Sequence, residues 1–195
     1  MRKIKLPFIF FVLIFAFTGF AQSKGDSLQV FNPLNQWINS NYRQIDFAIP
    51  LVYDPDSSED SNLGSLLPAG ANLNIGFGYQ YKKLVGLGIH TGINAHWNEQ
   101  LVSLPVYGNF RFSPKIQEHS ALVFQVGYGE AFALGRGDLN GDYKKISLGY
   151  ANTKDALFGS INIEFNELDF PIHDRERLRS FALGVTIVLF RPSKQ

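Results

Sequence analysis

Two histidines and two serines are the residues whose types could support hydrolytic or metal chemistry. His90 and His96 occupy same-parity positions of one alternating segment, so an extended strand would point both side chains to one side. Their separation along such a strand is about 20 Å, which is too far for one shared metal ion. Ser103 and Ser147 fall on the matching face of other segments, but no local signature pairs either serine with a histidine. The sequence therefore predicts no catalytic residues, no metal site and no cofactor.

A larger group of polar residues is expected to share one interior with these histidines. The group consists of His90, Asn94, His96, Asn109, Arg111, Glu130, Asn162 and Glu164. One reading is a polar site, as in barrel lipid hydrolases that use a His/Ser/acid set. The other is an Arg–Glu–His network that fills and stiffens a narrow barrel, because buried charges must pair and a small barrel holds only side chains. We favour the network.

Two polar segments could bind cations but are better explained as loops. Residues Gly137–Asp142 resemble half of a calcium loop, yet the later Glu of an EF-hand loop is missing. The Asn140-Gly141 pair within them is a strong turn signal. The acidic segment Asp54–Asp60 could bind divalent cations that bridge lipopolysaccharide, or could contact a partner. A solvated loop is the interpretation we favour for both.

These residues are positioned by segments in which bulky apolar residues alternate with small or polar ones. Between Leu73 and Tyr81, odd positions hold Leu, Ile, Phe and Tyr, whereas even positions hold Asn, Gly and Gln. Period two over nine or more residues predicts a β-strand. The pattern recurs in the segments 45–53, 73–81, 87–97, 102–112, 122–128, 146–150, 157–165 and 181–189. The sequence therefore predicts about eight strands.

The chemistry of the two faces indicates that the bulky face meets lipid. Charged residues make up 18% of the chain and aromatic residues 14%, whereas about 25% charge is usual in soluble domains. We therefore predict an all-β fold, an antiparallel transmembrane β-barrel with its small and polar face inside. The aromatic strand ends expected to form interfacial girdles are Tyr53, Tyr79, Tyr81, Trp97, Phe112 and Phe190. A soluble lipocalin-like lipid binder would invert the two faces.

The N-terminal residues have the three parts of an export signal. Arg2, Lys3 and Lys5 precede an apolar run, and Gly19 and Ala21 supply the small residues that a signal peptidase reads. We expect cleavage before Gln22, which makes residues 1–21 the signal peptide and directs the protein to the outer membrane. Residues 22–42 would form a periplasmic segment with a short helix, 43–190 the barrel and 191–195 a tail. With a periplasmic N-terminus, the longer connections would face outward.

Two neighbouring segments carry a family resemblance. The stretch Leu87–Asn94 followed by Leu101–Phe112 resembles the small outer-membrane β-barrel proteins of the Bacteroidota type, and the Ala21-Gln22 junction is similar to that group's export signals. The resemblance implies a porin-like or OmpA-like barrel and transfers no ligand or catalytic residues. Barrels of this kind commonly end on an aromatic residue that the insertion machinery reads, whereas here a five-residue tail follows Phe190.

Charge and cysteine content exclude several other functions. Removing the signal leaves a small acidic excess and no basic patch for nucleic acid. The absence of cysteine excludes a disulfide framework, a thiolate metal site, a Cys nucleophile and a lipoprotein anchor. We expect a non-enzymatic outer-membrane barrel with a structural, anchoring or partner-binding role. The alternatives are a lipid-modifying barrel enzyme and a narrow passive channel. The expected partners are outer-membrane lipid, lipopolysaccharide, the barrel-insertion machinery and an unidentified protein.

Overall fold

The computed structural model describes residues 40–54, 65–117, 119–135, 139–152, 157–170 and 177–191. The export signal, the short helix expected between the signal and the barrel, and the C-terminal tail after Arg191 lie outside these residues. The acidic segment 54–60 lies largely outside them. Of the calcium-loop resemblance at 137–142, only residues 137 and 138 lie outside them. Asn140, Gly141 and Asp142 form the start of a strand that pairs with residues 130–132, so the turn predicted at Asn140-Gly141 is wrong. Among the residues described, none belongs to a helix with the length and apolar character needed to cross a membrane.

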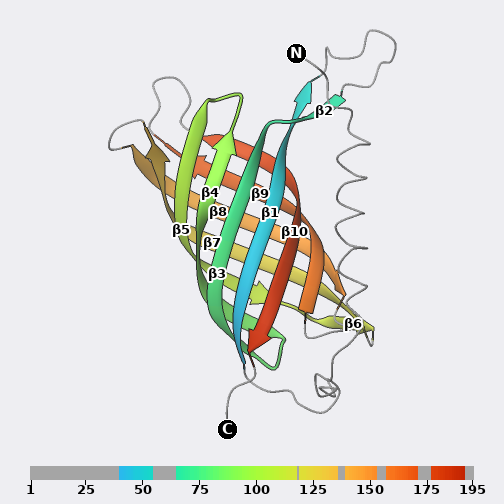
Figure 1. Ribbon diagram of the computed structural model, residues 1–195. Coiled ribbons are helices and arrows are strands. Elements are labelled where there is room, and N and C mark those ends of the chain that lie inside the picture. Colours follow the sequence, from blue (N-terminus) through green and yellow to red (C-terminus); the bar gives the residue numbers. More distant parts are fainter. Residues whose placement is uncertain are drawn as a thin grey trace, which may run out of the picture. The chain divides into compact units, whose positions relative to one another are not determined.

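Eight long strands form one closed antiparallel sheet, which confirms the predicted eight-stranded barrel (Figure 1). They are β1 (Ser40–Asp54), β3 (Gly70–Tyr81), β4 (Val85–His96), β5 (Leu101–Phe112), β7 (Ser120–Leu134), β8 (Asn140–Asn152), β9 (Leu157–Asp169) and β10 (Leu178–Arg191). Each pairs with its neighbour along the chain, and β10 pairs with β1 to close the sheet. The barrel therefore leaves no long strand edge unpaired.

Two short strands were not expected from the sequence. β2 (Ser65–Pro68) pairs with the end of β1, inside the connection between β1 and β3. β6 (Lys115–Gln117) pairs with the start of β7, inside the connection between β5 and β7. Both segments are too short to show a period of two, so alternation could not reveal them.

The strands are strongly tilted relative to the barrel axis. The tilt is shown by stepping from each residue to its paired partner on the next strand. A path that starts at Leu189 of β10 and goes once around the sheet returns to β10 at Arg179, ten residues away. The path passes through Arg43, Phe77, Ile89, Gly108, Tyr128, Lys144 and Glu167. Such a stagger is the condition for closing eight strands around a narrow interior that side chains can fill.

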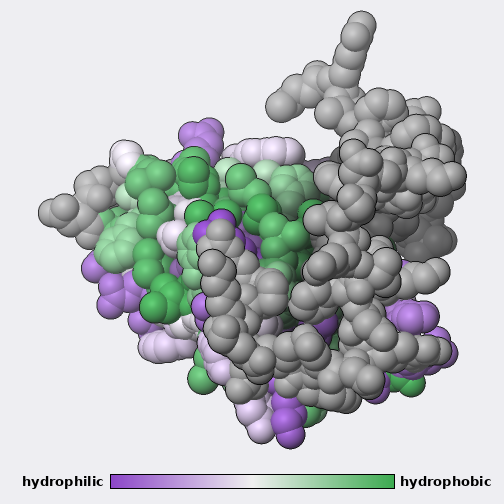
Figure 2. Space-filling view, turned by 60° about the horizontal axis from the view of Figure 1, so that its bottom comes forward, coloured by the Kyte–Doolittle hydropathy of each residue, from purple (hydrophilic) through white to green (hydrophobic). Residues whose placement is uncertain are grey.

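The two faces of the sheet differ as the alternation predicts. Bulky apolar residues point outward: Ile89 of β4 is 69% exposed and Leu183 of β10 is 37% exposed. Their polar neighbours point inward, and His90 is 1% exposed. Figure 2 shows hydrophobic residues gathered on the coloured part of the surface, with hydrophilic residues toward its margins. This arrangement contradicts the lipocalin-like alternative, which requires the large apolar side chains inside.

The two ends of the barrel carry different sets of connections. At the turn end lie the first and last described residues, together with the β3–β4, β5–β7 and β8–β9 connections. At the loop end lie the β1–β3, β4–β5, β7–β8 and β9–β10 connections. The β3–β4 turn is tight: the Leu84 amide donates to the Tyr81 carbonyl at 2.9 Å, and Lys82 and Lys83 have φ values of 49° and 52°.

The aromatic girdles follow the prediction at four positions and fail at one. Tyr79, Tyr81, Trp97 and Phe112 are exposed on the outer surface, and the side chain of Tyr53 is outside the described part. Phe190 was assigned to a girdle wrongly. It lies on the inward-facing parity of β10 and packs edge-on against Phe158, with 6.2 Å between ring centroids.

Candidate functional site

The barrel interior holds most of the polar residues singled out from the sequence. His90, Asn94, His96, Asn109, Arg111, Asn162 and Glu164 all point inward and are buried. Glu130 is the exception: it is exposed on the outer surface, so its assignment to the interior was wrong. In β7 the odd positions, such as Val123 and Gln125, point inward, and an even-numbered Glu130 must therefore point outward.

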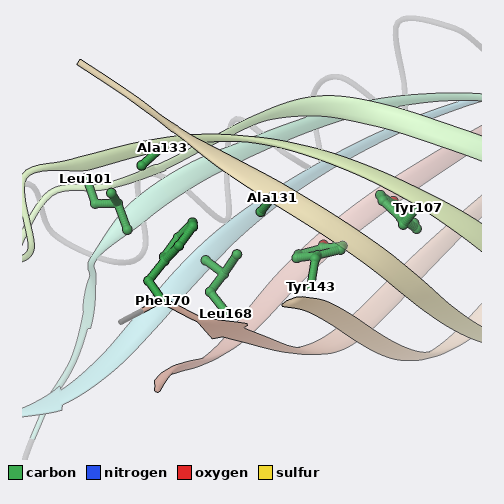
Figure 3. Close-up of a cluster of buried hydrophobic side chains, with 7 residues drawn as sticks. All are labelled: Leu101, Tyr107, Ala131, Ala133, Tyr143, Leu168 and Phe170. Atoms are coloured by element: carbon green, nitrogen blue, oxygen red, sulfur yellow. The ribbon is translucent and has the colours of Figure 1, made fainter. Parts of the chain in front are cut away.

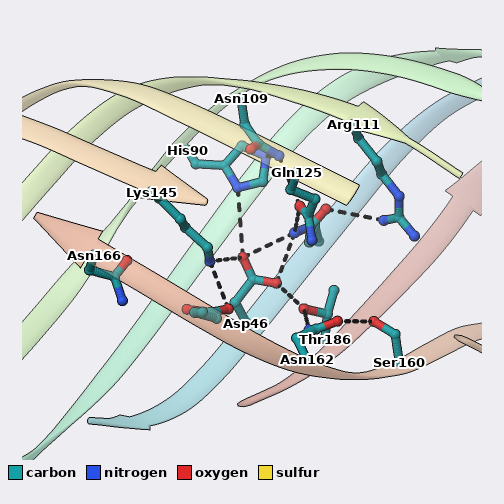
Figure 4. Close-up of polar contacts among 12 residues, drawn as sticks. Asp46, His90, Asn109, Arg111, Gln125, Lys145, Ser160, Asn162, Asn166 and Thr186 are labelled. Carbon is teal, nitrogen blue, oxygen red and sulfur yellow. Dashed lines mark hydrogen bonds and ion pairs between the residues drawn. The ribbon is translucent and has the colours of Figure 1, made fainter. Parts of the chain in front are cut away.

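Asp46 of β1 is the centre of the polar interior (Figure 4). Gln44 Nε2 donates to both of its carboxylate oxygens, at 2.8 and 3.0 Å, and Thr186 Oγ1 donates to Oδ1 at 2.5 Å. Lys145 Nζ lies 3.4 Å and His90 Nδ1 3.9 Å from Asp46 Oδ2. The carboxylate is 1% exposed, so these groups replace the water that a free carboxylate would bind.

Lys145 joins the two buried carboxylates. Its ammonium lies 2.9 Å from Glu164 Oε1 and 3.4 Å from Asp46 Oδ2, and its side chain is 1% exposed. Among the described residues, the interior thus holds two cations, Lys145 and Arg111. It also holds two acidic side chains, Asp46 and Glu164. A balanced set matters because an uncompensated charge in such a place is strongly destabilising.

A chain of amides links this centre to Arg111. Gln125 Oε1 accepts from Gln44 Nε2 at 2.8 Å and from Asn109 Nδ2 at 3.0 Å. Arg111 Nη1 donates to Gln44 Oε1 at 3.2 Å, and its Nε donates to Ser113 Oγ at 3.0 Å. The guanidinium also lies over the Phe158 ring, 4.5 Å from its centroid. The contacts of Gln44 with Gln125 and of Arg111 with Gln44 and Phe158 cross the lumen between strands that are not neighbours, so they brace the barrel from inside.

A second chain of contacts runs along β9 and β10. Ser160 Oγ donates to Asn162 Oδ1 at 3.0 Å, and Asn162 Nδ2 donates to Thr186 Oγ1 at 2.6 Å. Because the Thr186 hydroxyl in turn donates to Asp46, this chain ends on the same carboxylate. The two chains and the Lys145–Glu164 pair therefore form one connected network around Asp46, and a connected network is more rigid than separate pairs.

Apolar clusters lie on both sides of this network. Toward the loop end, seven buried residues pack together (Figure 3): Leu101, Tyr107, Ala131, Ala133, Tyr143, Leu168 and Phe170. Toward the turn end, the buried cluster consists of Tyr42, Ala121, Val123, Ala151, Phe158 and Val188. The Tyr107 ring joins the layers, because it lies 4.9 Å from Tyr143 and 5.3 Å from His90. The lumen is thus filled in three layers by side chains.

The described residues show no catalytic pairing of the serines and histidines considered above. Ser103 Oγ, Ser147 Oγ and His96 Nε2 are buried without a hydrogen-bond partner. His90 instead contacts Asp46 and, through Nε2, the Asn109 amide at 3.3 Å. Within the part of the chain described, no group of three His, Asp or Glu residues is placed to hold a metal ion.

Several residues of the network were not identified as candidates from the sequence. Asp46 and Thr186 stand on the inward parity of segments that were recognised, so alternation contained the signal. Lys145 was missed because the predicted segment began at Ile146, although Lys145 shares the parity of the inward-facing Ser147.

Comparisons with known proteins identify the fold and nothing finer. No family model matches the sequence, and no curated protein matches it. Among solved structures, the Neisserial surface protein A is similar with a TM-score of 0.55 and 13% identity, over 78% of this chain and 98% of that one. Ail of Yersinia pestis matches over 77% of this chain and 99% of its own, at 13% identity and a TM-score of 0.43.

A further neighbour is the N-terminal β-barrel domain of Pseudomonas aeruginosa OprF. It matches at 12% identity and a TM-score of 0.42, over 78% of this chain and all of that domain. At such low identity the likeness to Neisserial surface protein A supports the barrel fold alone. The resemblance to Bacteroidota barrels remains a prediction.

Proposed function

We propose that this protein is a non-enzymatic outer-membrane β-barrel with a structural, anchoring or partner-binding role, and that its lumen does not conduct. The observation that carries the proposal is the inversion of the barrel. Charged and amide side chains form a connected network inside, while bulky apolar side chains cover the outside. A water-soluble barrel has the opposite arrangement, and a lipid-embedded barrel has this one.

The outer surface supports residence in a bilayer. Large apolar side chains are exposed on all eight long strands, and those on β4 are among the most exposed, with Leu87 at 65%. Contiguous apolar surface of this extent is costly in water, at about 25 cal/mol per Å². An outer membrane reached through an export signal and the barrel-insertion machinery would bury it. The short turn between β3 and β4 supports a periplasmic turn end.

The loop-end exterior supports lipopolysaccharide as a lipid partner. On β8 and β10, Lys144 and Arg179 flank Glu167, at 3.1 and 2.8 Å from its carboxylate oxygens. Both cationic side chains remain substantially exposed, at 44% and 59%. Exposed cations beside an apolar belt can contact lipid phosphates. A protein partner would meet the same end of the barrel.

The geometry supports the two alternatives less well. A lipid-modifying enzyme needs a nucleophile within hydrogen-bond reach of its base, and Ser103 Oγ has no such partner. A passive channel needs an open path, whereas Lys145, Arg111 and the two apolar clusters occupy the lumen. Water-filled channels appear in much wider barrels of about 16 strands.

Fractionation and bilayer recording together test this function. We expect the exported chain to sediment with the outer membrane and to change its gel mobility on heating. We also expect no stable single-channel conductance from the purified barrel in planar bilayers. Recovery as a soluble periplasmic protein would contradict the membrane location. A steady porin-sized conductance would contradict the closed lumen and favour passive transport.

A further inference from the structure

The charges on the outside of the barrel are distributed unequally between its ends. Every carboxylate whose side chain is described lies either in the lumen or at the loop end. The lumen holds Asp46 and Glu164, and the loop end holds Glu99, Glu130, Asp142, Glu167 and Asp169. The turn end carries the cations Arg43, Lys82, Lys83 and Lys115. Among described side chains, the turn end is therefore positive, and it suits an anionic partner.

The tip of the β3–β4 hairpin shows that these lysines are not explained by the fold. Lys82 and Lys83 both have positive φ, 49° and 52°, in a two-residue turn closed by the Leu84 amide. Turns of this type strongly favour Asn-Gly, because a side chain at positive φ is sterically disfavoured. Two consecutive lysines therefore destabilise this turn relative to Asn-Gly. We infer that they are present because their charge binds a ligand.

The cations lie against aromatic rings of the outer belt. Arg43 pairs in register with Phe77, and its guanidinium lies 5.8 Å from the centroid of that ring. Lys82 Nζ lies 5.2 Å from the centroid of Tyr81, which is 50% exposed. Aromatic rings mark the depth of the membrane interface, where cationic side chains reach the headgroups. The rings therefore hold Arg43 and Lys82 at headgroup depth.

Positive charge is concentrated at this hairpin tip. Lys83 Nζ lies 5.4 Å from the centroid of Phe190 at the barrel mouth. Burial lowers the pKa of Lys83, and the positive charge of Lys115 lowers it further. An anion bound between Lys83 and Lys115 would offset the repulsion between their charges.

We propose that the turn end carries a binding surface for the phosphate groups of anionic glycerophospholipids, formed by Arg43 and Lys82 with Lys83 and Lys115 beside them. Arg presents a planar fork that matches phosphate oxygens, and Lys supplies a point charge. The proposal rests on the membrane location argued above. With a periplasmic turn end, the surface faces the inner leaflet, and the bound lipids would fix the depth and orientation of the barrel.

A redesigned turn separates lipid binding from folding. The full chain and the double variant Lys82→Asn/Lys83→Gly are inserted into phosphatidylcholine vesicles with and without phosphatidylglycerol, and their urea unfolding midpoints are compared. We expect phosphatidylglycerol to raise the midpoint of the unaltered protein, and added salt to reduce that rise. The variant should be at least as stable in pure phosphatidylcholine, because Asn-Gly suits the turn. Its gain from phosphatidylglycerol should fall to less than half.

Two further variants locate the effect. Arg43→Gln should also reduce the gain from phosphatidylglycerol. The loop-end control Arg177→Gln, which removes an exposed cation paired with Asp169 at 3.4 Å, should retain the gain. An undiminished gain in the double variant, or a reduction of the gain in Arg177→Gln as large as in the double variant, would overturn the proposed surface. Insertion with no gain from phosphatidylglycerol in any protein would overturn this inference and leave the membrane barrel intact. Failure to insert into either bilayer would overturn both.

Discussion

Lys144 and Lys145 are consecutive residues that reach opposite sides of the barrel wall. Lys144 points outward and pairs with Glu167 at 3.1 Å, with 44% of its side chain exposed. Lys145 points inward and pairs with Glu164 at 2.9 Å and Asp46 at 3.4 Å, with 1% exposed. The distances are alike, but the surroundings differ. The comparison teaches that burial, rather than the length of the ion pair, decides how much the protein depends on it.

Removing the inner lysine has the largest expected effect. Lys145→Met leaves Asp46 and Glu164 without their shared cation, which should lower the free energy of unfolding by about 3–5 kcal/mol. Urea unfolding in lipid vesicles measures the change. The double variant Lys145→Met/Glu164→Gln should recover part of the loss, because one stranded carboxylate is neutralised. A double variant less stable than Lys145→Met would show that Glu164 is not compensated by Lys145.

The second largest effect is expected from a cation placed on the apolar outer face of the barrel. Ile75 is 43% exposed on the outer face of β3, between the inward-facing Asn74 and Gly76. Ile75→Arg should cost about 2–4 kcal/mol if this position lies near the bilayer midplane, and it should impair assembly. Heat-dependent gel mobility of membrane fractions reports the assembled share, with Ile75→Val as the conservative control. Equal assembly of Ile75→Arg and the unaltered protein would contradict the lipid-facing assignment.

Removing the outer lysine has the smallest expected effect. Lys144→Met should change the free energy of unfolding by at most about 1 kcal/mol, because exposed pairs are screened by solvent. Glu167 also keeps a partner, since Arg179 Nε lies 2.8 Å from its other oxygen. The same urea titration measures it beside Lys145→Met. Similar losses for the two lysine variants would show that burial does not separate the two pairs.

Most of the architecture follows from alternation along the chain. A period of two identified the long strands and assigned bulky side chains to the outside, because a strand needs only its own sequence to present two different faces. Applied without exception, the same parity would also have placed Glu130 outside and Phe190 inside. Those two errors came from departing from the parity of their strands.

The sequence by itself determined which side of the wall each side chain takes, and the tertiary structure alone decided which inward side chains meet. Asp46 and Lys145 belong to β1 and β8, which are not neighbours in the sheet, yet they face each other across the lumen. The stagger of the closed sheet sets the height along the barrel axis at which the polar residues of each strand lie. Local alternation carries no information about that height, because it arises only when β10 pairs with β1 and the circle closes.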